Sequence, residues 1–195
     1  MTVRRVAVSG GPGAGKTTLW REIARAHAGS VVAVPEVATL MLQHVFPPVQ
    51  DETERHALQR SIFAVQKELE AVHERRLQPG QVLLCDRGTP DGAAYWPAGP
   101  DAFFAAMQTR WEDELARYDA VLFLETAAAG GLPIADGNAA RTEDQATAVA
   151  LHERMLAVWS RHPNFHYVAH ERELSAKVAR GSAALLAYLA GAARV

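Results

Sequence analysis

The sequence predicts an α/β fold in which helices cover both faces of a parallel sheet. Short apolar runs alternate with longer segments of helical periodicity along the 195 residues. The runs are nearly continuously apolar, as expected for strands buried on both faces. A glycine-rich turn joins the first run to the first helical segment. Because no linker, repeat or low-complexity tract divides the chain, we expect a single domain over residues 1–195.

Each element follows from a local pattern. The runs expected to form strands are Val3–Ser9, Ser30–Pro35, Gln81–Asp86, Ala120–Glu125 and Phe165–His170. The expected helices are Thr17–Ala28, Asp51–Leu77, Asp101–Arg117, Glu143–Ser160 and about Leu174–Leu189. In the longest of them the residues at steps of three and four, which predict the core-facing side, are Leu58, Ile62, Val65, Leu69 and Val72.

The turn after the first strand carries the strongest chemical signal. Residues 10–17 read GGPGAGKT and match the phosphate-binding pattern G-x-x-x-x-G-K-[ST]. Glycines let the backbone approach an anion, and the N–H groups at the following helix N-terminus hold a di- or triphosphate. Lys16 is expected to reach the β- and γ-phosphates, and the Thr17 hydroxyl to bind Mg²⁺. The expected nucleotide-binding residues are Gly11, Pro12, Gly13, Ala14, Gly15, Lys16, Thr17 and Thr18.

Charged residues at the ends of the second and third strands form a second signal. Asp86 ends the third strand, where a carboxylate can hold Mg²⁺ or act as a base, and Arg87 can grip a phosphate. Glu36 ends the second strand at the same edge and competes with Asp86 for the role of base. The alternatives are that Asp86 only caps the following turn and that Glu36 is an exposed loop residue.

A segment rich in glycine and proline, residues 130–140, predicts a mobile loop, and we expect a lid over about 127–145. Arg141 on this lid would neutralise charge on the transferring phosphoryl group. Thr142 is the expected cap of the next helix. The alternative for Arg141 is a solvated residue near a helix start.

Other residues give weaker signals. Tyr95 and Trp96 follow the Asp86-Arg87 pair and either stack on a base or fill a local apolar cluster. His166 and His170 lie in an expected strand without a third ligand, so we predict no zinc site. Cys85 is expected to be a buried strand thiol.

Bulk properties exclude some classes of partner. A net charge of −2 and the lack of a basic cluster argue against nucleic acid. No apolar run is long enough to cross a bilayer, and the first strand begins too early for a signal peptide, so we expect a cytoplasmic protein. The oligomeric state stays open between monomer and dimer.

The chain resembles a small group of P-loop ATPases and kinases, the ribosylnicotinamide-kinase-like (AAA-type ATP-binding) group, which is related to nucleoside and nucleotide kinases. The resemblance rests on residues 6–19, 35–38 and 85–95 and, more loosely, on 136–143. It implies a three-layer P-loop NTPase fold with a five-stranded parallel sheet in the order 2-3-1-4-5 and a lid. That order would place Asp86 beside the phosphate loop.

The leading functional hypothesis is Mg²⁺-assisted phosphoryl transfer from ATP to a small hydroxyl or phosphate acceptor that resembles a nucleoside or nucleotide. The acceptor would sit between the long helix 51–77 and the loop 86–96. The alternative is an ATP- or GTP-binding switch with slow hydrolysis, and ATP is favoured because no Asn-Lys-x-Asp element occurs. An oligomeric mechanochemical ATPase is disfavoured because the chain has no second helical domain.

Overall fold

A computed structural model describes residues 4–130 and 144–192 of the chain and contains a five-stranded parallel sheet. The strands are β1 (Arg4–Gly10), β2 (Val31–Val34), β3 (Val82–Asp86), β4 (Ala120–Leu124) and β5 (Phe165–Val168). Their spatial order is β2-β3-β1-β4-β5, and every neighbouring pair is parallel. The predicted fold class and strand order are therefore confirmed.

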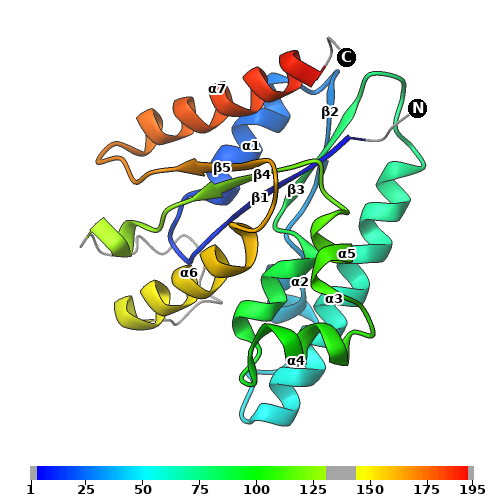
Figure 1. The fold of residues 1–195 in the computed structure, drawn as a ribbon, viewed down its shortest axis with the longest axis vertical. Helices are drawn as coiled ribbons and strands as arrows, with labels where there is room; N and C mark the ends of the chain where they lie inside the picture. The colour runs from blue at the N-terminus through cyan, green and yellow to red at the C-terminus, as the bar shows by residue number, and fades with distance from the viewer. Residues whose placement is uncertain (1–3, 131–143, 193–195) are drawn as a thin grey trace.

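Helices cover both faces of this sheet and produce three layers (Figure 1). The α-helices are α1 (Lys16–Ala26), α2 (Val37–His44), α3 (Glu52–Glu74), α4 (Gly99–Ala106), α5 (Trp111–Leu115), α6 (Gln145–Trp159) and α7 (Leu174–Ala192). The 3₁₀ helices are η1 (Thr89–Tyr95) and η2 (Ala127–Gly130). Helices α1 and α7 pack on one face, whereas α3 and α6 pack on the other. Every residue of β3 and β4 is buried, which explains why these strands are continuously apolar.

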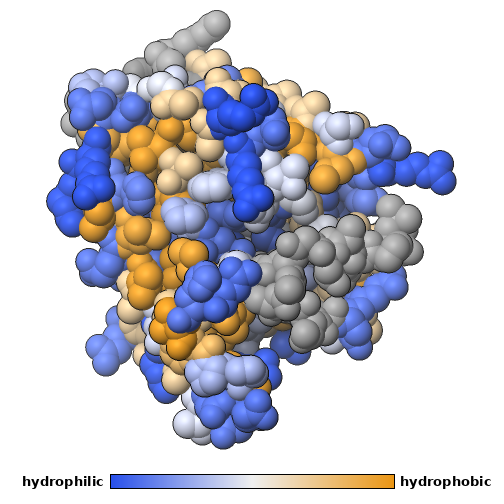
Figure 2. Space-filling view, turned by 180° about the vertical axis from the view of Figure 1, so that it is seen from behind, coloured by the Kyte–Doolittle hydropathy of each residue, from blue (hydrophilic) through white to orange (hydrophobic). Residues whose placement is uncertain are grey.

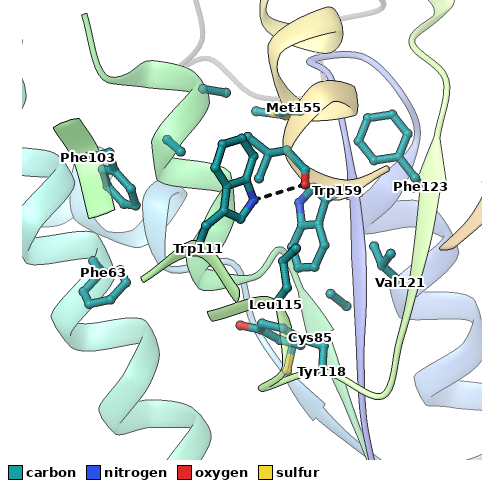
Figure 3. Packing of buried hydrophobic residues seen from close by; sticks show 14 of the residues in the cluster. Phe63, Cys85, Phe103, Trp111, Leu115, Tyr118, Val121, Phe123, Met155 and Trp159 are labelled. Carbon is teal, nitrogen blue, oxygen red and sulfur yellow. Dashed lines mark hydrogen bonds between the residues drawn. The ribbon is translucent and has the colours of Figure 1, made fainter. Parts of the chain in front are cut away.

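The larger of the two main cores lies between the sheet and the α3 and α6 side. Aromatic rings fill much of it, and Figure 3 shows Trp111 and Trp159 next to each other at its centre. The Trp111 Nε1 donates a hydrogen bond to the Val158 carbonyl at 3.3 Å, and Tyr118 packs edge-on against Trp159. Cys85 is completely buried here, and burial raises the pKa of its thiol well above the usual value. The expectation of a buried strand thiol is confirmed.

The helices differ from the prediction in two places. The chain after β2 forms α2, which the sequence analysis did not predict. The predicted helix Asp101–Arg117 is broken into α4 and α5, because Gln108 adopts a left-handed conformation with φ of 54°. No glycine or proline marks this break, and a hydrogen bond from Thr109 Oγ1 to Glu114 (2.9 Å) stabilises the turn.

The prediction for the core-facing side of α3 is correct in part. The buried residues of this helix are Leu58, Gln59, Phe63, Gln66 and Glu70. Of the predicted stripe, Leu58 is buried, Ile62 and Leu69 are partly buried in apolar clusters, and Val65 is 42% exposed. Polar residues of α3 also face the interior: Gln59 and Gln66 line a cavity, and Glu70 pairs with Arg5 and Arg117.

The outer surface mixes apolar and charged side chains. Figure 2 shows hydrophobic patches interrupted by hydrophilic side chains on the back of the molecule. Large apolar side chains that stay exposed include Leu40 of α2 and Val45, which directly follows this helix. Within 4–130 and 144–192, each helix is too short or too polar to traverse a lipid bilayer.

Candidate nucleotide and acceptor site

The loop between β1 and α1 has the backbone shape that its glycines predict. Gly10, Gly13 and Gly15 have φ angles of 138°, 69° and 84°, which L side chains rarely adopt. A Cβ atom on Gly10 would lie 2.2 Å from the Leu124 carbonyl oxygen. Helix α1 then begins at Lys16, so the N–H groups of its first turn point toward the loop.

Side chains from three different elements hold the carbonyl groups of this loop. Lys16 Nζ donates to the Gly11 carbonyl at 2.7 Å. The Thr126 hydroxyl donates to the carbonyl of Pro12, and Lys177 Nζ donates to the Ala14 carbonyl at 2.8 Å. Thr126 lies in the segment after β4, and Lys177 lies on α7. Neither residue was predicted to contact the phosphate loop.

Asp86 lies at the end of β3, directly beside the end of β1, because the register pairs it with Val8. Its side chain is buried, and its Oδ1 has no hydrogen-bond partner among the described residues. Burial and the negative charge of Glu36 raise the pKa of this carboxyl group, whereas Lys16 and a hydrogen bond with Thr17 lower it. Thr17 and Asp86, the two predicted Mg²⁺ ligands, therefore lie in contact.

A carboxylate with an open oxygen next to a threonine hydroxyl suits Mg²⁺, which prefers oxygen ligands and keeps several waters. Such a site needs few protein ligands. The part of the chain that the structure describes contains no group of three or more His, Cys, Asp or Glu side chains that could hold a metal ion.

Arg87 is held between two carboxylates. Its Nε donates to Glu36, and its Nη1 donates to Asp91 at 3.0 Å. Its backbone φ of 76° is rare for a residue with a side chain, so these contacts fix an unusual conformation. The remaining nitrogen, Nη2, is buried without a hydrogen-bond partner in the described chain.

Glu36 is part of this arrangement and is not the exposed loop residue that the sequence left as an alternative. Its side chain is 8% exposed at the start of α2. Its Oε1 accepts from Arg87, and its Oε2 accepts from the Thr39 hydroxyl at 2.6 Å. Both oxygens of Glu36 are thus occupied, in contrast to the open oxygen of Asp86.

Asp91 is a further buried carboxylate, which lies within the segment 85–95 of the family resemblance but was given no role there. It accepts hydrogen bonds from the Ser9 hydroxyl at 2.7 Å and from Trp159 Nε1 at 2.6 Å, in addition to Arg87. Ser9 directly precedes the phosphate loop. Asp91 therefore connects β1, α6 and the Arg87 side chain.

A cavity of about 690 Å³ lies between α2, α3, η1 and the first turn of α6. This is the place where the sequence analysis expects an acceptor. Its apolar lining includes Val37, Leu42, Leu58, Ile62, Phe63 and Phe103. Its polar lining includes Arg55, Gln59, Gln66, Arg87, Thr89, Asp91, Tyr95, Asp144 and Thr147. Tyr95 thus lines the cavity, whereas Trp96 is buried and stacks on His56 with ring centroids 3.9 Å apart.

The predicted lid falls mostly on residues 131–143, and Arg141 lies outside the described residues. The helix that follows begins at Gln145, and its N-cap is Asp144, whose Oδ1 accepts from the Thr147 N–H at 2.8 Å. The prediction that Thr142 caps this helix is therefore wrong. Asp144 provides the better cap because its carboxylate reaches the third N–H of the helix.

His152 of α6 is another residue that the sequence did not reveal. It packs so closely against the phosphate loop that a Cβ on Gly11 would lie 2.7 Å from the His152 Cβ. Burial and the positive charges of Lys16 and Lys177 lower the pKa of its imidazole, although Glu125 opposes this effect. We expect His152 to be neutral at pH 7. A histidine that stands seven residues into a helix gives no sequence signal of this contact.

Comparison with known proteins agrees with this site. A family model described as an AAA domain matches residues 5–173, which include the phosphate loop, Glu36, Asp86, Asp91 and α6. A search of curated proteins gave no match. The match covers most of the chain, and we therefore conclude that the chain belongs to this AAA domain family, which is of the nucleotide-binding P-loop NTPase type.

Proposed function

We propose that the protein is a small-molecule kinase that transfers the γ-phosphoryl group of ATP to a hydroxyl group of an uncharged, nucleoside-like acceptor. The single domain of residues 1–195 would carry both sites, with a lid over about 127–145 that includes Arg141. The observation that supports this proposal most strongly is the cavity of about 690 Å³, whose wall includes Arg87 and Asp91. A nucleotide switch without an acceptor does not require such a cavity.

The charge of the cavity lining favours a neutral acceptor over a phosphorylated one. Its charged residues are two arginines, Arg55 and Arg87, and two aspartates, Asp91 and Asp144, so that their formal charges cancel. Arg87 is already paired with Glu36 and Asp91, so that Arg55 is the one lining arginine in the described chain that could hold a phosphate group. A phosphate group on the acceptor is expected to need arginines that are free to bind it bidentately.

The polar groups on the apolar walls suit a ring with hydrogen-bonding edges. Gln59 is buried, and its amide makes no hydrogen bond to another described residue. The side-chain N–H of Gln66 donates to Glu70 at 2.8 Å, so its side-chain carbonyl oxygen can accept a hydrogen bond from an acceptor molecule in the cavity. Amide groups of this kind can pair with the edge of a base, and Phe63 and Tyr95 supply apolar or aromatic surface.

The roles proposed at the phosphate end follow from the same contacts. Lys16 would exchange the Gly11 carbonyl for the β- and γ-phosphates, and Thr17 with Asp86 would hold Mg²⁺, which neutralises phosphate charge. Arg87 would offer its unpaired Nη2 to the developing charge. Of the two candidate bases, Asp86 is favoured, because Glu36 would first have to release Arg87 or Thr39.

The test measures product formation from Mg²⁺-ATP with a panel of nucleosides, ribosylnicotinamide, sugars and nucleoside monophosphates. We expect a phosphorylated product from a nucleoside-like compound and much less from the monophosphates. Lys16→Ala and Asp86→Asn should abolish it, whereas the exposed control Asp113→Asn should not. Glu36→Gln should retain more activity than Asp86→Asn. Tight ATP binding without acceptor-dependent product would contradict the kinase proposal and favour the switch.

A further inference from the structure

Lys177 lies buried behind the phosphate loop. It belongs to α7, its exposed fraction is 2%, and its Nζ donates to the carbonyl groups of Ala14 and Glu125. The same helix touches the next residue of the loop, since a Cβ on Gly15 would lie 2.8 Å from Leu174 Cδ1. Lys177 thus joins three parts of the fold: the phosphate loop, the segment after β4, and α7.

The contact with Ala14 determines how the neighbouring N–H group points. A trans peptide is planar, with its C=O and N–H directed to opposite sides. Because Lys177 holds the Ala14 carbonyl, the N–H of Gly15 is turned away from Lys177. The Thr126 hydroxyl does the same for the Pro12 carbonyl and the N–H of Gly13. These two donors fix alternate peptides of the loop before any anion is bound.

The charge of Lys177 depends on what surrounds it. Burial lowers the pKa of its ammonium group to about 8, although Glu125 and Glu171 favour the charged form. Glu125 is itself bound by the N–H of His170 and by Tyr167, and Glu171 pairs with Arg180. His152 faces the same cluster from α6, and the positive charge of Lys177 lowers its pKa.

A polyphosphate in the loop would lie one peptide group away from the Lys177 ammonium. Its negative charge favours the protonated amine, so binding raises the pKa of Lys177 above its value in the free protein. Well below pH 8 the lysine is charged in both states, and pH has little effect through this group. As the pH rises above 8, the free protein loses the proton first and binding must take it up again, so affinity falls.

We propose that Lys177 is a positioning residue of the nucleotide site, which orients the anion-binding N–H groups of the phosphate loop and requires its own positive charge to do so. The proposal rests on the proposed nucleotide binding at this loop. It adds a second lysine, from the C-terminal helix, to the Lys16 of the motif.

The test is isothermal titration of the full chain with Mg²⁺-ATP and, separately, with tripolyphosphate, from pH 7 to 9.5. The terminal phosphate of ATP ionises near pH 6 and is ionised throughout this range. Tripolyphosphate loses a further proton within the range, so each pH profile is compared with that of Lys177→Arg measured with the same anion. We expect wild-type affinity to fall about tenfold between pH 7.5 and 9.5, as linkage to a group with a free-state pKa near 8 requires. Lys177→Arg keeps its charge throughout and should lose this dependence.

Lys177→Met fills a similar volume without a donor or a charge, and should bind both anions about tenfold or more weakly at pH 7. Lys67→Met is the matched control, because Lys67 is 39% exposed on α3. Circular dichroism confirms that each variant is folded. Equal affinity and an equal pH profile in wild type and Lys177→Arg would overturn the proposal. Should wild type bind neither anion at any pH, the proposed nucleotide site itself would be wrong.

Discussion

Two buried carboxylates at opposite ends of the sheet, Glu70 and Asp86, show how differently the same chemical group can be used. Glu70 of α3 lies near the start of β1, and Asp86 lies at the end of β3, beside the phosphate loop. Their exposed fractions are nearly equal, at 0% and 1%. Their surroundings, however, differ in the number of hydrogen-bond donors that reach them.

Glu70 is fully satisfied. Its Oε1 accepts from Gln66 at 2.8 Å and from the Tyr118 hydroxyl at 2.7 Å. Its Oε2 contacts Arg117 at 2.6 Å and Arg5 at 3.3 Å. Two cations and two further donors balance one buried charge, as a carboxylate with a purely structural role requires.

Asp86, in contrast, keeps an oxygen without a partner in the described chain. A buried, unsatisfied carboxylate oxygen destabilises a fold unless a ligand completes it. The comparison teaches that an open oxygen on the carboxylate itself, rather than burial or charge, distinguishes Asp86 from Glu70. Unsatisfied nitrogens occur in both regions: Arg87 Nη2 and His152 Nδ1 near the phosphate loop, and Arg5 Nε and Arg117 Nε beside Glu70.

The largest effect on stability is expected from Glu70→Gln. Removal of the negative charge weakens the charge balance of Arg5 and Arg117, which keep Glu74 and Glu114 respectively, so the free energy of unfolding should fall by about 3 kcal/mol, the lower end of the cost of a broken buried pair. Urea denaturation followed by circular dichroism measures this loss. Glu68→Gln, an exposed change on the same helix, is the control. A loss as small as that of the control would show that Glu70 is not needed to balance these arginines.

Asp86→Asn should have the opposite balance of effects. The substitution removes an incompletely paired buried charge, so the free energy of unfolding should stay the same or rise. Affinity for Mg²⁺-nucleotide should fall about 10–100-fold, the usual cost of a lost group around a metal. Titrations of nucleotide with and without Mg²⁺ check this. An equal loss of affinity in both would show that Asp86 does not bind the metal.

The smallest effect is expected from Ser9→Ala. Asp91 would lose one of its hydrogen bonds but would keep Trp159 and Arg87, so the free energy of unfolding should fall by only about 1 kcal/mol. Thermal and urea unfolding measure it. A loss of stability as large as that of Glu70→Gln would mean that Asp91, like Glu70, has a mainly structural role rather than a role in the candidate site.

Local patterns predicted the parts of the molecule that depend on local rules. The strands were predictable because both faces are buried, and residues 10–17 were predictable because the loop needs glycines at fixed positions. The place of Asp86 beside the loop required the strand order, which came from the family resemblance. The cavity between α3 and η1 was expected in position, although its lining could not be read from the sequence.

Contacts between distant segments could not be predicted. Lys177 reaches Ala14 across 163 positions of the chain, and no spacing rule relates the two residues. The buried polar residues of α3 were missed because periodicity marks only its apolar positions, and Leu58 and Ile62 pack in a cluster with the unpredicted α2. The break at Gln108 depends on the tertiary contacts of Thr109 and Glu114, which periodicity does not report.

The scarcity of lysine gives the fold a distinct chemical reactivity. The chain has three lysines, and two of them, Lys16 and Lys177, are buried against the phosphate loop. Lys67 is the lysine side chain that an amine-directed dye or cross-linker can reach in the folded protein. A label on Lys67 of α3 would report on the acceptor side of the molecule. The two lysines that contact the phosphate loop would become reactive only when this part of the protein unfolds locally.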